Sequence, residues 1–487
     1  MASSTSSYVL TLPLQTRHHE ANILEKRFEI ARKIYNACLA EADKRLRVMQ
    51  ESKDYQKARK LPSSTPSERK LRSTTFRQLN KRFKLEEYAL HTYVKSMQTR
   101  FKHLIDSHTA QKLASRAHHA VKKKQIGMAT KVSFKGFGKL NSVEGKTNAA
   151  GIRYKDRKIY WLGLELPVRI KPKDDYVFLA LESRVKYSRI LRTFMKGTIR
   201  YQIQLILEGT PPQKYNQVGI KGKLGKGRVG IDIGTQTAAI VSDSKASLVE
   251  LAPSVIHIQK EIRLIQRAMD RSRRAMNPEK FNKDGTINRS SKRWVQSKRY
   301  GKLKAAFQEI NRLHSVYRKQ DHCCLANQII EQGDEFFIET MNFQALQKRA
   351  KETTRNKNGR FNRKKRFGKS IARKAPSMLI TILEQKRSIF GIELKKINTS
   401  KAKASQYHHE TNTFQKKSLS ERWNLIRNER VQRDLYSAYL IKNVTESLDS
   451  INRYLCVDAY DHFKKLHDIE IIRIKSSNQN KISSFGI

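Results

Sequence analysis

Three acidic residues lie in separate apolar stretches of the chain, where an ionised carboxylate costs free energy unless it binds a compensating partner. Asp232 lies inside the strand-like run "VGIDIG", Glu339 ends the strand-like "FFIE", and Asp434 opens the helix-like "RDLYSAYLI". A lone carboxylate in an apolar strand costs free energy unless a second charge compensates it. We therefore expect a ligand beside Asp232 and further acids near it.

The residues around Asp232 predict how its carboxylate is presented. Strand alternation places Val229, Ile231 and Ile233 on one face of the strand and Asp232 on the other. Gly230 and Gly234 flank it, which leaves space for a ligand or a backbone segment to approach closely. In the third stretch the small residues after Asp434, Ser437 and Ala438, favour a helix that packs tightly.

Three convergent carboxylates would favour Mg2+, which prefers oxygen ligands and also binds phosphate oxygens. Two such ions about 4 Å apart activate water and stabilise the leaving oxygen in phosphodiester hydrolysis. A bound cation would also explain an ionised Asp232.

Each acid also has a purely structural interpretation. Asp232 could belong to a turn, Glu339 could be a surface acid at a strand end, and Asp434 could be a helix N-cap. Asp458 and Asp461 in "VDAYDHF" compete more weakly for the third role.

The sequence pattern predicts that the strands and helices that position these acids form a mixed α/β chain. A short strand at 8–13 precedes a helical zone to about 125, and residues 128–210 alternate as in an antiparallel sheet or small barrel. A strand–turn–strand unit starts at 228, and helices, a strand at 335–342, a helix near 376–390 and a strand at 392–397 follow. This order favours a mixed α/β layer over a helical bundle.

The charge of the chain indicates a polyanionic partner. Lys and Arg number 100 against 44 Asp and Glu, a formal net charge of +56. Such an excess repels itself unless nucleic acid neutralises it. No apolar run approaches the roughly 20 residues of a transmembrane helix, so we expect no membrane partner and a cytoplasmic protein of prokaryotic type.

Two basic segments are candidates for nucleic-acid contact. Residues 348–374 contain thirteen Lys or Arg and one acid, with Phe361 and Phe367 able to stack on bases; a solvated charge run is the alternative. The candidate contact residues are Arg355, Arg360, Arg363, Lys364, Lys365, Arg366, Lys122, Lys123 and Lys124.

The stretches "GIDIG", "FFIETMNFQALQKR" and "QRDLYSAYLI" resemble, in order, the three RuvC motifs of the TnpB (OrfB) family. Those proteins are RNA-guided DNA nucleases, to which compact type V CRISPR effectors are related. "RKIYNACL" near the N-terminus resembles the first recognition helix of the family. The resemblance implies that Asp232, Glu339 and Asp434 are both the catalytic residues and the metal ligands.

The resemblance also implies a fold: an RNase H-like RuvC nuclease domain and a wedge-type β-barrel interrupted by a helical recognition lobe. The expected boundaries are 1–17 for the first barrel strand, 18–127 for the lobe, 128–218 for the rest of the barrel, 219–227 for a linker and 228–487 for the nuclease. A degenerate ribbon is expected at about 398–430.

The chain departs from the family pattern at two places. Many members carry a four-cysteine zinc ribbon between the second and third motifs, but here Ser405 and Gln406 lead to His408 and Thr411, without cysteine. Adjacent His408 and His409 are poorly spaced for one tetrahedral zinc, so we predict a ribbon without zinc. At the third motif, Tyr436 replaces an asparagine that is common in the family.

The resulting expectation is an RNA-guided DNA endonuclease that binds a structured guide RNA and double-stranded target DNA. Its cofactor would be Mg2+, as two ions, with Mn2+ able to substitute, and we expect no zinc. An RNA-guided DNA-binding protein or repressor without cleavage, and a transposase acting directly on transposon ends, are the alternatives. The sequence leaves open monomer or dimer, and a transposon or CRISPR origin of the guide.

Overall fold

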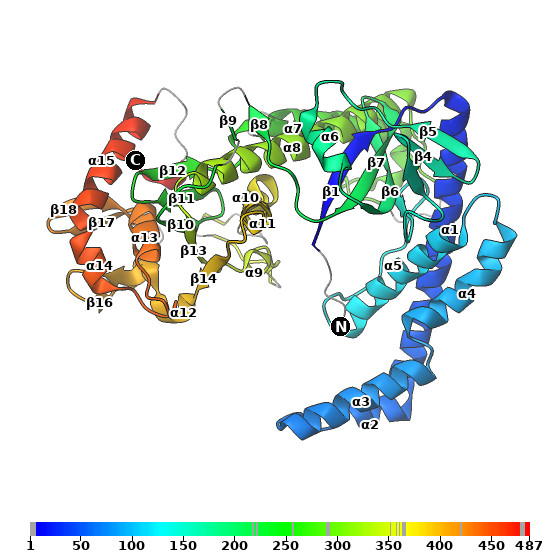
Figure 1. Ribbon diagram of the computed structural model, residues 1–487, viewed down its shortest axis with the longest axis horizontal. Helices are drawn as coiled ribbons and strands as arrows, with labels where there is room; N and C mark the ends of the chain where they lie inside the picture. Colours follow the sequence, from blue (N-terminus) through cyan, green and yellow to red (C-terminus); the bar gives the residue numbers. More distant parts are fainter. Residues whose placement is uncertain are drawn as a thin grey trace. The chain divides into compact units, whose positions relative to one another are not determined.

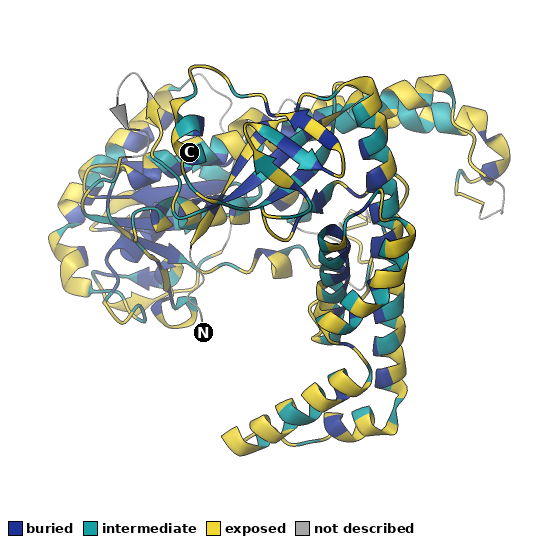
Figure 2. Cartoon of the chain, turned by 45° about the vertical axis from the view of Figure 1, so that its right-hand side comes forward, coloured by how far each residue is buried: buried dark blue, intermediate teal, exposed yellow. Residues whose placement is uncertain are grey.

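Figure 1 shows the computed structural model of the chain, in which runs of several helices are followed by runs of several strands. The structure describes residues 6–216, 219–220, 223–255, 258–288, 293–350, 352–356, 358–359, 361–362, 367–418, 421–477 and 483–487. Buried residues concentrate on the sheets and on one side of the long helices, as Figure 2 shows. Within the described residues, every helix is too short or too polar to cross a membrane.

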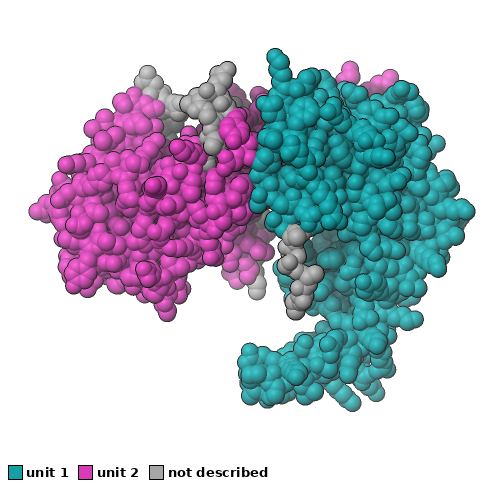
Figure 3. Space-filling model, in the orientation of Figure 1, with its two compact units in different colours: residues 1–212 teal, residues 213–487 magenta. Residues whose placement is uncertain are grey.

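The chain forms two compact units, Met1–Pro212 and Gln213–Ile487, coloured separately in Figure 3. The N-terminal unit begins with strand β1 (Ser7–Pro13), which is followed by the helices α1 (His18–Glu51), α2 (Lys53–Arg59), α3 (Pro66–Arg82), α4 (Glu87–Arg100) and α5 (Ser107–Gln125). Its remaining elements are β2 (Ser142–Glu144), β3 (Arg153–Lys155), β4 (Lys158–Trp161), β5 (Leu164–Pro167), α6 (Asp175–Leu181), β6 (Val185–Met195) and β7 (Thr198–Glu208).

The helices of this unit follow local sequence signals. The face predicted to be apolar on α1 is buried, including Leu24, Phe28 and Cys38. After the break around Pro62, α3 starts with Pro66 at its first turn and a capping box between Thr65 and Glu68.

Strand β1 pairs with β7, so the six helices α1 to α6 and the strands β2 to β6 are inserted in sequence between two neighbouring strands of one sheet. The sheet order is β1-β7-β6-β2, and β3-β4-β5 form a separate sheet. The predicted turn "KDRK" joins β3 to β4, with Asp156 and Arg157 at positive φ, as a two-residue hairpin requires.

The expected closed β-barrel is wrong for the strands that the structure describes. Only the isolated bridge between Leu14 and Val168 connects the region of β1 to the end of β5. The edge strand β2 has three residues, too few to continue the ladder around a closed sheet. The predicted alternation of β7 is confirmed, since Tyr201, Ile203 and Leu205 are buried.

The C-terminal unit is built on a five-stranded sheet. Its strands are β10 (Arg228–Ile233), β11 (Thr237–Val241), β12 (Ala246–Glu250), β13 (Glu335–Glu339) and β14 (Leu394–Ile397), in the order β12-β11-β10-β13-β14. The first three form an antiparallel meander, while β13 and β14 run parallel to β10. Before them, β8 (Tyr215–Asn216) and β9 (Gly219–Ile220) form a short hairpin that includes the start of the predicted linker.

Helices cover both faces of this sheet. The helices of this unit are α7 (Ile258–Met276), α8 (Lys298–Ile330), α9 (Phe343–Leu346), α10 (Gly368–Lys374), α11 (Pro376–Ser388), α12 (Thr399–Ala402), α13 (Arg433–Lys442), α14 (Arg453–Asp458) and α15 (Tyr460–Ser476). One apolar core joins the face carrying Ile231 to the end of α8 and to α11. The opposite core joins the face carrying Phe337 to α13 and α15. The sheet is thus a buried central layer.

Candidate active site

Asp232 and Glu339 are neighbours on two parallel strands. Ile231 of β10 is opposite Ile338 of β13, and both side chains enter the core beneath α8 and α11. The next residue of each strand is Asp232 or Glu339, so both carboxylates emerge on the other face. Both are partly exposed, at the ends of strands that are otherwise buried. Strand register alone therefore brings two of the three predicted acids together.

The third acid is brought to the same face by α13. This helix packs on β10 and β11, and its residues Leu435 and Ala438 lie in the core that contains Phe337. Asp434 stands in the first turn of the helix and remains partly exposed, while the following residues are buried. The N-cap is Gln432, whose side chain accepts a hydrogen bond of 2.9 Å from the Leu435 amide. Asp434 is therefore free of the capping role that the sequence had left open.

Gly230 allows this close packing. A Cβ atom at Gly230 would lie 2.1 Å from the carbonyl oxygen of Ala438 and 2.4 Å from the amide nitrogen of Lys442. The sequence predicted that a ligand or backbone would approach here, and the structure shows that it is the backbone of α13. Gly234 differs, because its nearest neighbour would be the Thr237 hydroxyl at 3.3 Å.

The three carboxylates influence one another electrostatically. Burial is the main cause that raises the pKa of Asp232 well above its ordinary value, and the charges of Glu339 and Asp434 raise it further. The Arg433 guanidinium opposes this increase. Burial also raises the pKa of Glu339. Like charges held together in a partly desolvated place favour a bound cation.

Arginines compensate Asp434 in the protein itself. The Arg433 Nε lies 3.3 Å from one carboxylate oxygen of Asp434, and an Arg422 guanidinium nitrogen lies 3.8 Å from the other. Arg433 also donates to the backbone carbonyls of Ser418 and Glu421. Sequence reasoning missed both arginines, although the position of Arg433 beside Asp434 was an available signal.

The donor set suits Mg2+ because it consists only of carboxylate oxygens that are partly open to solvent. The oxygens of the three acids are not all within 4.8 Å of one another, a spacing that only Glu87, His118 and His119 meet among the described residues. The expected pair of Mg2+ ions stays a prediction. Asp232, Glu339 and Asp434 are the residues that would hold them.

The competing acids lie elsewhere. Asp461 forms an ion pair with Arg427 at 2.9 Å, and Asp458 is exposed at the end of α14. Neither is among the groups that shift the pKa of Asp232.

The predicted ribbon segment forms two small hairpins. Strands β15 (Tyr407–His408) and β16 (Thr413–Phe414) make the first, and β17 (Trp423–Ile426) and β18 (Glu429–Gln432) make the second. The second hairpin leads directly into α13, so this segment determines where that helix starts.

The cysteine-free ribbon segment and Tyr436 are the two places where the sequence differs from the TnpB motifs, and they contact each other through His409. Tyr436 points away from Asp434, and its hydroxyl lies 2.7 Å from Nδ1 of His409 and accepts a hydrogen bond of 3.1 Å from the His409 amide. His409 is fully buried, with Tyr460 and Tyr439 against its ring. An aromatic core around His409 thus joins the ribbon segment to α13.

The predicted nucleic-acid contacts are only partly placed. The guanidinium of Arg355 lies over the ring of Phe361, 4.6 Å from its centroid, and the Phe361 side chain is exposed. Phe367, by contrast, packs against the core below α11. Lys122 and Lys123 are exposed at the end of α5, whereas Lys124 forms a 2.6 Å ion pair with Asp43. Arg360, Arg363, Lys364, Lys365 and Arg366 lie outside the described residues.

Comparisons with known proteins give structural similarity only. No protein-family model and no curated protein matches the chain. A solved structure named "Cryo-EM structure of the Cas12f1-sgRNA-target DNA complex" is similar with a TM-score of 0.43 and 10% identity, over 90% of this chain and 99% of that chain. The "Cryo-EM structure of CRISPR-Cas12f Ternary Complex" gives 0.25 and 13%, over 88% and 82%. TM-scores below 0.5 leave the function to be argued from the chain's own residues.

Proposed function

We propose that the protein is an RNA-guided DNA endonuclease with a single RuvC-type site at Asp232, Glu339 and Asp434. The observation that carries the proposal is the meeting of these three acids, from β10, β13 and α13, on one face of one sheet. They are separated by more than 90 residues from one another in sequence, so only a fold built around them brings them together.

The sheet supports a nuclease of the RNase H-like class. Its strand order is third, second, first, fourth and fifth, with an antiparallel meander followed by two strands parallel to the first. The acids lie on the first strand, on the fourth strand and on a late helix covering the same face. This arrangement agrees with the proposed relation to the TnpB family and to compact type V effectors.

Asp232, Glu339 and Asp434 would hold Mg2+ and bring a DNA phosphate to the partly exposed face of the sheet. Bound Mg2+ supplies an activated water and stabilises the charge that develops on phosphate oxygens. Arg433 and Arg422 are placed to orient the Asp434 carboxylate. Mn2+ would substitute, because it also accepts oxygen ligands.

The net charge of +56 supports a large nucleic-acid footprint. A guide RNA would supply sequence specificity by base pairing, and the protein would recognise the shape of the heteroduplex and a short flanking motif. We propose that the ribbon segment needs no zinc, since the buried aromatic core around His409 already joins it to α13.

The decisive experiment uses the wild-type protein with the RNA that copurifies with it. That RNA is sequenced, and linear DNA complementary to its variable part is incubated with the complex and Mg2+. We expect cleavage that needs both RNA and Mg2+ and falls by at least about a thousandfold in Asp232→Ala, while RNA binding persists. Binding without cleavage by the wild type would favour a repressor. Strand joining without RNA would favour a transposase.

A further inference from the structure

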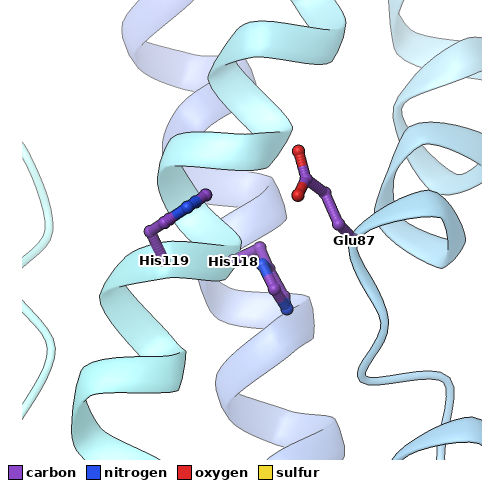
Figure 4. Close-up of side chains that lie close together, drawn as sticks. All are labelled: Glu87, His118 and His119. Carbon is purple, nitrogen blue, oxygen red and sulfur yellow. The ribbon is translucent and has the colours of Figure 1, made fainter. Parts of the chain in front are cut away.

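A second cluster of possible metal ligands lies in the N-terminal unit, between α4 and α5. Glu87, His118 and His119 each place one ligand atom within 4.8 Å of the others. Figure 4 shows the Glu87 carboxylate directed from the start of α4 towards α5, which carries both histidines. All three residues belong to the same compact unit, and this cluster takes no part in the proposed nuclease site.

Each histidine keeps one ring nitrogen available. Nδ1 of His119 lies 2.7 Å from the Ser115 carbonyl, so it donates there and leaves Nε2 as the acceptor. Nδ1 of His118 is buried without a hydrogen-bond partner among the described residues. A metal-binding histidine typically has the arrangement of His119, with one nitrogen fixed by a carbonyl and the other free.

The use of different nitrogens explains how adjacent histidines can share one ion. Consecutive side chains on a helix diverge by about 100°, which normally separates their distal atoms. Here the rings of His118 and His119 lie edge to face with centroids 5.6 Å apart. The nitrogens left for an ion are Nδ1 of His118, close to the backbone, and Nε2 of His119, the distal one.

The carboxylate is positioned by neighbouring polar side chains. The Ser115 hydroxyl donates to Glu87 Oε1, and Nε2 of His91 lies 2.9 Å from the same hydroxyl. His91 itself is 3.7 Å from Glu87 Oε1. Hydrogen bonds to a ligating carboxylate of this kind orient it for a metal.

We propose that Glu87, His118 and His119 form a binding site for a divalent transition metal, with Zn2+ as the best fit. Two imidazole nitrogens and one carboxylate are a common zinc set, and such three-ligand sites leave the fourth position to water. His119 is exposed, so water has access to that position. The ion would fix the start of α4 against the second half of α5.

The test uses full-length protein without a polyhistidine tag, freed of nucleic acid and treated with chelator. Co2+ is titrated in excess Mg2+, which occupies sites made only of oxygens, and the d–d absorption bands report bound Co2+. We expect one equivalent bound with the strong bands of four-coordinate Co2+, displaced by Zn2+. Glu87→Gln and His118→Ala should weaken binding by more than about tenfold.

The chain offers a matched control. His18 and His19 are also adjacent on a helix, and His19 lies 4.0 Å from Glu20, but His18, His19 and Glu20 do not form such a cluster. The double variant His18→Ala, His19→Ala should bind Co2+ like the wild type. The exposed His119→Gln should weaken binding without loss of helical circular dichroism, which separates a ligand from a folding residue. Unchanged Co2+ binding in His118→Ala and His119→Gln would overturn the proposal, and so would its loss in the control.

Discussion

Gly230 and Ala438 are in contact through backbone atoms, because a Cβ on Gly230 would lie 2.1 Å from the Ala438 carbonyl oxygen. This contact holds α13 against the central strand that carries Asp232. The helix starts one residue before Asp434, so its distance from the strand decides where the third carboxylate lies. Glycine at 230 is thus required for a close approach, in the same motif as the first catalytic candidate.

Gly230→Ala should move α13 and lower DNA cleavage by about a hundredfold or more, because a shift of about 1 Å at a catalytic group has an effect of that size. Cleavage rates of the purified complex measure it. Gly234→Ala is the control, since its Cβ would meet the Thr237 hydroxyl at 3.3 Å and the Thr237 carbonyl oxygen at an ordinary contact distance of 3.5 Å. Equal rates for Gly230→Ala and the wild type would show that α13 does not set the geometry of the site.

Asp232→Asn should stabilise the metal-free protein and abolish its response to Mg2+. The substitution removes the central charge from a group of three carboxylates, and this repulsion is what a cation relieves in the wild type. Thermal unfolding with and without Mg2+ measures both effects. We expect Mg2+ to raise the Tm of the wild type by a few degrees, which corresponds to about 1 kcal/mol. An identical Mg2+ response in Asp232→Asn would place the cation elsewhere.

Tyr436→Phe should destabilise the C-terminal unit by about 1–3 kcal/mol, because Nδ1 of buried His409 loses its partner. Denaturant unfolding measures the loss. Tyr407→Phe is the matched control, as its hydroxyl donates to the Asn412 side chain in a less buried place, and it should cost less.

If the ribbon segment binds no zinc, a chelator will leave the Tm of the C-terminal unit unchanged, and a large decrease would contradict the prediction.

Stability should fall in mild acid because of His409. Burial is the main cause that lowers its pKa to about 4, while Glu410 raises it and His408 and Arg427 lower it. The unfolded pKa is about 6.5, so between these values only the unfolded chain binds the proton, and stability is lost as pH falls. The contribution reaches about 3 kcal/mol at pH 4. The free energy of unfolding, measured in urea between pH 7 and pH 4, should change less steeply with pH in His409→Gln than in the wild type. Equal slopes in the two proteins would contradict this.

Neighbouring lysines at the end of α5 should behave differently. Lys122→Ala with Lys123→Ala should weaken RNA binding and reduce the salt dependence of the affinity, by about 0.7 in slope for each lost phosphate contact. Lys124→Ala should leave that slope unchanged and cost up to about 1 kcal/mol of stability, because Lys124 pairs with Asp43 at 2.6 Å. Filter binding over a range of salt concentrations distinguishes them. A slope that falls only in Lys124→Ala would reverse the assignment.

Local pattern predicted most elements of the fold. The strand at 8–13, the apolar face of α1, the hairpin turn at Asp156 and Arg157, and the strands that carry Asp232 and Glu339 all follow from period, capping and turn residues. The closed barrel that the sequence predicted does not form among the described strands, because closure depends on which strand edges are long enough to pair. The partnership of Lys124 with Asp43 joins helices far apart in sequence, and no local signal indicates it.

The sequence by itself determined the three acids, the apolar elements that carry them and the charge that requires a polyanion, since these depend on residue type and short-range spacing. Only the tertiary structure decided that Gly230 admits the backbone of α13, that Gln432 caps this helix in place of Asp434, and that Tyr436 turns away to meet His409. It also brought Glu87 of α4 to the histidines of α5. Apart from the local Gln432 cap, each of these outcomes is a contact between elements, and its geometry is fixed by packing rather than by the order of residues along one element.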